Sequence, residues 1–200
     1  SWKSSVSRDT MVYIGANDGS LHAFKLATGE EKWAFVPKNL QAKLMLATDP
    51  TYDMCNAAYC HQYFVDGSPH VADIYDTAAS TWKTILIVGE REGGEAYFAL
   101  DVTSGKAFDA SSPDTPSAYL WQFTDTQLGQ TWAYPSINRV ADGSGTAWAV
   151  FFGSGYSASN QASKESYLYG ILAKDASALW NDGSSAVNRI KIFDKAYLNY

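Results

Sequence analysis

The fold is decided by residues 11–36, which read MVYIGANDGSLHAFKLATGEEKWAFV. Three short runs rich in β-branched and aromatic residues, 11–15, 21–26 and 32–36, alternate with two turn sequences. The first turn contains Asn17, Asp18 and Gly19, which readily adopt the positive φ that a tight hairpin demands. Strands of this length with a turn about every ten residues predict an antiparallel, all-β architecture.

The same pattern returns twice further along the chain. Strands are predicted at 82–89, 96–101 and 119–123, and again at 148–153, 167–172 and 188–193. Residues 66–76 and 132–142 supply a leading strand to each of these two copies. The copies are in register, because three landmarks recur 66 residues later: Pro69 as Pro135, Asp76 as Asp142, and Trp82 as Trp148.

Four short strands per repeat are typical of a β-propeller blade. We therefore expect one segment, residues 1–200, that forms a partial β-propeller of about three four-stranded antiparallel blades. The blades are expected at approximately 11–36, 63–124 and 129–193, with long loop insertions at 37–62, 106–118 and 154–166. Because closed propellers use about 4–8 blades, the sequence indicates a fragment of a larger propeller, or one that pairs its edges with another chain.

The composition of the chain argues against several classes of function. The 200 residues are 46% hydrophobic, enough for a core, with 15 Lys and Arg against 21 Asp and Glu and a net charge of −6. This acidic balance argues against nucleic acid as a partner, since such binding needs basic patches. No apolar run of about 18 residues occurs, so we expect no membrane insertion. No paired carboxylates or nucleophile motif stand out, and we predict no catalytic residues and no metal ligands.

The aromatic residues fall into two groups. Residues 23–33 resemble the tryptophan-docking repeat of quinoprotein-type propellers, in which an indole packs between blades. Repeat positions make four tryptophans candidate blade-packing residues in the core: Trp33, Trp82, Trp121 and Trp148. Four other aromatic residues lie in insertions, where they either pack or contact a binding partner: Tyr52, Tyr59, Tyr156 and Trp180.

Cys55 and Cys60 are the two cysteines of the chain. A local disulfide in an oxidising compartment is the favoured interpretation, and two free thiols or a metal site are the alternatives. A disulfide here would fix the shape of the 37–62 insertion.

A longer set of segments resembles the propeller of PilY and PilC proteins, adhesins at the tip of type IV pili. The matching segments occur in collinear order: 14–24, 61–69, 71–73, 82–89, 98–103, Leu128-Gly129 with Pro135, and 153–156. The resemblance implies an extracellular, non-enzymatic binding and assembly module at the pilus tip or the outer-membrane surface of a Gram-negative bacterium. Its implied partners are minor pilins, the pilus tip complex and a host-cell or surface receptor.

Two departures from this family pattern bear on ligands. The Asp-rich calcium loop of the family is absent from this sequence, so no cofactor is expected in the segment, although calcium elsewhere in the full-length protein stays possible. Glu90, Arg91, Glu92 and Glu95 replace the small residues expected in one turn, which suggests a different ligand preference. The alternatives are a segment of a quinoprotein-type (PQQ-like) propeller dehydrogenase and an outer-membrane assembly scaffold.

Overall fold

The computed structural model describes residues 2, 8–50, 52, 61–104, 118–141, 145–156, 165–181 and 186–193. The first of its sheets contains three antiparallel strands in the order β1-β2-β3: β1 (Met11–Gly15), β2 (Leu21–Lys25) and β3 (Glu31–Phe35). The Ala16–Ser20 turn closes the first hairpin, and Gly19 has the positive φ of 99° that the sequence predicts there.

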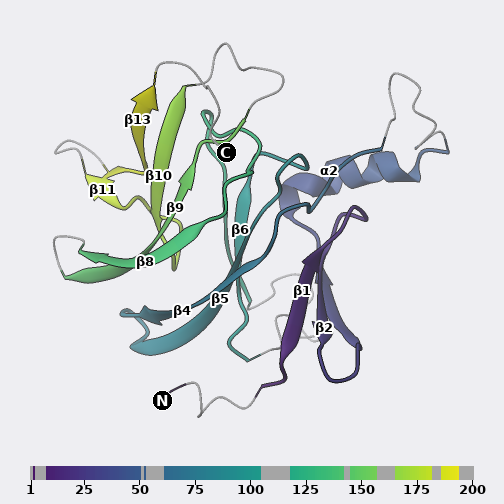
Figure 1. The fold of residues 1–200 in the computed structure, drawn as a ribbon, viewed down its shortest axis with the longest axis horizontal. Coiled ribbons are helices and arrows are strands. Elements are labelled where there is room, and N and C mark those ends of the chain that lie inside the picture. Colours follow the sequence, from purple (N-terminus) through teal and green to yellow (C-terminus); the bar gives the residue numbers. More distant parts are fainter. Residues whose placement is uncertain are drawn as a thin grey trace.

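Two four-stranded antiparallel sheets follow (Figure 1). The second sheet has the order β4-β5-β6-β7: β4 (His70–Asp76), β5 (Thr81–Gly89), β6 (Tyr97–Asp101) and β7 (Tyr119–Phe123). The third has the order β13-β10-β9-β8: β8 (Ser136–Ala141), β9 (Thr146–Gly153), β10 (Ser166–Leu172) and β13 (Arg189–Phe193). The predicted all-β, antiparallel class is confirmed. One small hairpin, β11 (Trp180–Asn181) with β12 (Ala186–Val187), was not predicted.

A helical segment occupies the start of the 37–62 region, where the sequence analysis expected a loop. It comprises η1 (Lys38–Leu40), α2 (Gln41–Leu44) and η2 (Met45–Thr48). Residues 41–46 are mostly good helix formers, and Leu40 and Leu44 are spaced to lie on one face. Leu40 is buried in the core and Leu44 packs against it, so tertiary contacts stabilise a helix too short to form alone.

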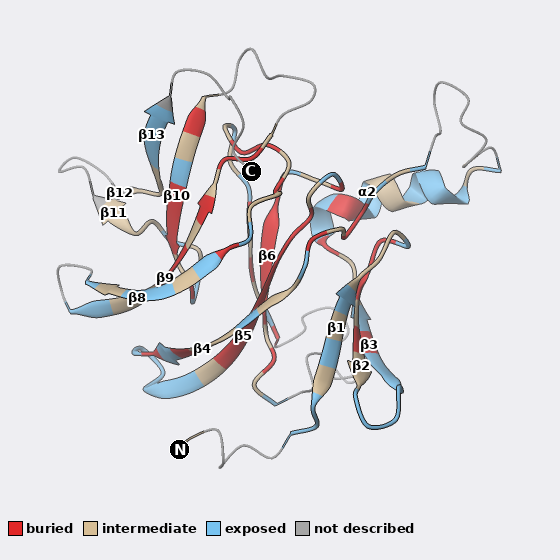
Figure 2. Cartoon of the chain, viewed as in Figure 1, coloured by how far each residue is buried: buried red, intermediate tan, exposed pale blue. Residues whose placement is uncertain are grey.

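The core consists of two apolar layers, one on each face of the second sheet. Leu86 and Phe98 belong to the layer shared with the first sheet, whereas Ile87 and Tyr97 belong to the layer shared with the third. Successive strand residues point to opposite faces, and β5 and β6 are buried on both (Figure 2). The three sheets are therefore packed side by side, with the second in the middle.

The four predicted packing tryptophans occupy different environments. Trp33 lies in the first layer and Trp121 in the second. The Trp121 indole Nε1 donates at 2.9 Å to the carbonyl of Ala173, the residue that follows β10 of the third sheet. Trp148 is partly buried against the second layer. The prediction of a core position is wrong for Trp82, which is 36% exposed because it lies at the start of β5, at the edge of the packed faces.

Candidate binding surface

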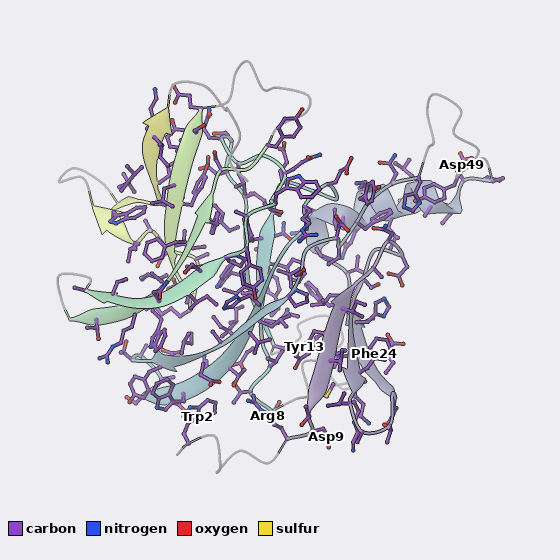
Figure 3. All side chains as sticks on the ribbon, viewed as in Figure 1. Trp2, Arg8, Asp9, Tyr13, Phe24 and Asp49 are labelled. Carbon is purple, nitrogen blue, oxygen red and sulfur yellow. The ribbon has the colours of Figure 1, made fainter. Side chains whose placement is uncertain are left out.

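The helical segment and the chain that returns from it form a projection on the side of the molecule away from the third sheet (Figure 1). We define this helical projection as residues 38–50, Tyr52 and 61–65. Figure 3 labels Asp49 at its outer end. Three large hydrophobic side chains of the projection are exposed: Met45 by 73%, Leu46 by 39% and Tyr63 by 39%. Exposed apolar side chains gathered on one segment are a common feature of protein-binding surfaces.

Lys43 fastens the projection to the second sheet. Its ammonium donates to the carbonyl oxygens of Tyr63 at 2.6 Å and Gly93 at 2.9 Å, and lies 5.2 Å from the centre of the Phe64 ring. Partial burial lowers the pKa of Lys43, against the opposing effect of Glu90 and Glu92. The lysine therefore ties the helix, the returning chain and the turn after β5 into one unit.

The first hairpin holds the returning chain from the other side. The Phe64 amide donates to Asn17 Oδ1 at 3.1 Å, and the Val65 amide donates to the Ala16 carbonyl at 3.3 Å. Asn17 Nδ2 also lies 3.2 Å from Nε2 of His61. Asn17 thus has two functions, as a turn residue predicted from sequence and as an anchor of the projection.

Glu90 lies fully buried beneath the projection. Asn39 Nδ2 donates to its Oε2 at 2.8 Å, and the Glu90 amide donates to Thr131 Oγ1 at 2.7 Å. Its other carboxyl oxygen, Oε1, has no hydrogen-bond partner within the described part of the chain. Burial raises the pKa of Glu90 from 4.5 to about 7, with Asn39 and Lys43 acting in the opposite direction. A neutral carboxylic acid is therefore favoured up to near-neutral pH.

The other unusual residues of this turn point elsewhere. Arg91 places its guanidinium 5.7 Å from the centre of the Trp132 ring, whereas Glu92 and Glu95 are exposed. The sequence marks this turn as unusual because charged residues replace the small residues expected there. Its burial of Glu90 was not foreseen, because it depends on the approach of Asn39, which is 51 residues away in the chain.

The aromatic residues predicted as binding contacts do not meet in one place. Tyr52 belongs to the projection, where its Oη accepts the Gln62 amide at 3.1 Å. Tyr156 pairs through its backbone with Gln130 beside the third sheet. Trp180 is half-buried over Gly170 and Phe151. Tyr59, Cys55 and Cys60 lie outside the described residues.

Met45 and Leu46 were missed as candidate contacts. The available signal was the run Ala42-Lys43-Leu44-Met45-Leu46, whose apolar residues exceed what one helical face can bury.

Two absences hold for the described residues. No three of their His, Cys, Asp and Glu side chains gather into a group that would suit a metal ion. None of their helices has the length and apolar character to cross a membrane.

Antiparallel meandering sheets packed side by side through shared apolar layers define a β-propeller-type domain. Comparison with known protein families identifies the family within this class. The PilY1 beta-propeller domain matches residues 2–189, and the chain belongs to this family. The resemblance to PilY and PilC proteins is thereby confirmed.

Individual relatives agree with this family. The chain is 39% identical over 156 residues to "Type IV pilus biogenesis factor PilY1" of Pseudomonas aeruginosa strain UCBPP-PA14, covering 76% of the chain and 12% of the relative. It is 41% identical over 152 residues to a PilY1 homolog of Xylella fastidiosa strain Temecula1, covering 74% of the chain and 11% of the relative. The crystal structure of the Pseudomonas aeruginosa PilY1 C-terminal domain matches with a TM-score of 0.64 and 30% identity, covering 96% of this chain and 32% of that one. The chain thus spans roughly a tenth of the length of these curated relatives.

Proposed function

We propose that this chain is a propeller segment of a type IV pilus biogenesis factor and that its helical projection binds another protein of the pilus tip, such as a minor pilin. The segment is then one part of a larger propeller of four-stranded blades, extracellular at the pilus tip or the outer-membrane surface of a Gram-negative bacterium. A host-cell or surface receptor is a second partner in this proposal. No catalytic residue and no cofactor are assigned to the segment.

The observation that carries the proposal is the combination of exposed apolar side chains with rigid anchoring. Met45 and Leu46 are exposed, while Leu40, five and six residues earlier, is 2% exposed in the core. Asn39 and Lys43 add polar contacts between the projection and the turn that follows β5 of the second sheet. A surface that is already ordered loses little conformational entropy on binding, which favours affinity.

Introducing charge at the exposed apolar residues of the projection tests the proposal. Changing Met45→Asp together with Leu46→Asp should weaken binding to a purified minor-pilin complex by about tenfold or more, as expected for apolar residues at the centre of an interface. Surface piliation should fall in parallel in a strain that lacks its own copy of the protein. Binding is measured by surface plasmon resonance.

Leu26→Asp is the matched control, because Leu26 is an equally apolar side chain, 61% exposed, in the turn after β2. It should leave binding and piliation unchanged. Equal affinity of the double variant and the control would refute the assignment of the binding surface to the projection.

The predicted Cys55–Cys60 disulfide bears on the same region. We propose that it stabilises the conformation of the 37–62 insertion, so that Cys→Ser at both positions should weaken pilin or cell attachment while the unfolding curve of the sheets stays in place. The assay is attachment alongside circular dichroism. Undiminished attachment by the double variant would reject this role.

A further inference from the structure

A pocket of 340 Å³ lies between the second and third sheets, on the opposite side of the fold from the projection. Its lining residues come from the last parts of β4 and β8, the turn after β4, and the first parts of β5 and β9. Its lining combines three aromatic residues, one arginine and two threonines: Tyr75, Thr77, Trp82, Arg139, Thr146 and Trp148. Its volume falls within the range of about 300–1,000 Å³ that is usual for small-molecule sites.

The aromatic walls are fixed by the sheets. Trp82 pairs across the strands with Tyr75, and Trp148 with Arg139. The Trp82 ring stands at 65° to Tyr75, with centroids 5.5 Å apart, and at 66° to Trp148 at 6.2 Å. Because Trp82 and Trp148 occupy equivalent positions of the repeat, the fold itself places two indoles at this edge.

Two of these three rings stay partly exposed. Tyr75 is 38% and Trp82 36% exposed, unlike the buried Trp33 and Trp121. The Trp2 indole lies on Trp82 with an interplanar angle of 6° and centroids 6.1 Å apart, beside the ends of β4 and β5 (Figure 3). Trp2 therefore covers one face of Trp82, and the 36% exposure of Trp82 is what stays open with Trp2 in place.

The polar groups give the pocket a positive charge. Arg139 donates from Nε and Nη2 to Thr146 Oγ1 at 3.0 and 2.8 Å, and makes no ion pair with any described residue. The nearby Asp76 is already paired with Lys83 at 2.9 Å. Lys174 lines the adjoining cavity but its ammonium lies 3.7 Å from the Asp175 carboxylate, so the positive charge of the pocket comes from Arg139. In a chain of net charge −6, this local cation favours an anionic ligand.

We propose that this aromatic–arginine pocket binds an acidic saccharide. The apolar C–H face of a pyranose ring packs on Trp82 or Trp148, and the hydroxyls of Thr77 and Thr146 bond to the sugar hydroxyls. The carboxylate accepts hydrogen bonds from Arg139, whose planar guanidinium matches its geometry. The proposal concerns a different surface from the projection and stands independently of the pilin-binding proposal.

Isothermal titration calorimetry with trigalacturonic acid tests it, with the neutral trimethyl ester of the same sugar as the charge control. The protein should bind the acid, and its affinity for the ester should be lower by about tenfold or more, as expected when one charge-assisted contact is lost. Trp82→Ala and Arg139→Gln should each weaken binding of the acid by about tenfold, and Arg139→Lys should recover part of the loss.

Tyr134→Ala is the matched control, because Tyr134 is 61% exposed and lies against His70, outside the pocket. Arg139 is exposed, so Arg139→Gln keeps the test valid even if Trp82→Ala alters folding. Absence of binding at millimolar acid, equal affinity for acid and ester, or equal losses in Tyr134→Ala and Arg139→Gln would each overturn the proposal.

Discussion

Replacing Trp121 by alanine is expected to lower the free energy of unfolding by about 3–5 kcal/mol, the range typical of buried Trp and Phe. Trp121 is 5% exposed and fills the apolar layer between the second and third sheets. Its loss creates a cavity and also removes the hydrogen bond that the Ala173 carbonyl accepts. Urea unfolding followed by circular dichroism measures the change.

Trp82→Ala is the informative comparison, because the two tryptophans hold repeat positions but differ in burial. Trp82 is 36% exposed at the edge of the packed faces, so Trp82→Ala should cost about 1–2 kcal/mol, clearly less than Trp121→Ala. Trp121→Phe should fall between the two, since it keeps most of the apolar volume. Similar losses for Trp82→Ala and Trp121→Ala would contradict the packing described for these sheets.

The stability of the protein is expected to fall as pH rises from about 4.5 to about 7, through Glu90. Burial raises the pKa of this carboxyl from 4.5 to about 7 in the folded state. The folded state therefore holds the proton over this window while the unfolded state releases it. The full effect, reached above about pH 7, is on the order of 3 kcal/mol of lost stability, and below about pH 4.5 it disappears.

Glu90→Gln isolates this contribution, because the amide cannot ionise and its oxygen can still accept from Asn39. The free energy of unfolding of the native protein, minus that of the variant, should decrease with pH between about 4.5 and 7. A Glu90→Gln difference that is constant or rises with pH would show that the carboxyl is not held protonated by the fold.

Strand positions could be predicted well because they depend on local chemistry. The Asn17-Asp18-Gly19 turn and the alternation of turn and apolar run specify each hairpin without reference to the rest of the chain. The 66-residue spacing then related the second and third sheets, and it holds for β4 with β8 and for β5 with β9, whereas β10 and β13 begin three or four residues later than it would place them. The helical segment at Lys38–Thr48 could not be identified in this way, because its stability comes from the burial of Leu40.

Candidate contacts were harder to predict than strands. Tyr52, Tyr156 and Trp180 were chosen for lying in insertions, yet the structure leaves them in three separate environments. Trp82 was expected in the core because its repeat position resembles that of buried indoles. Exposure depends on how far the neighbouring sheet extends, and no pattern within one repeat contains that information.

The sequence by itself determined the antiparallel strands, their grouping into repeats and the family resemblance, since turn residues and period-2 alternation act over a few residues. Only the tertiary structure decided which side chains are buried, which protrude and which meet. Asn39 reaches Glu90, and Trp82 faces Trp148, across more than fifty residues of chain. Such contacts arise from the packing of whole sheets against one another, and for that reason the projection, the buried acid and the aromatic–arginine pocket emerged only in three dimensions.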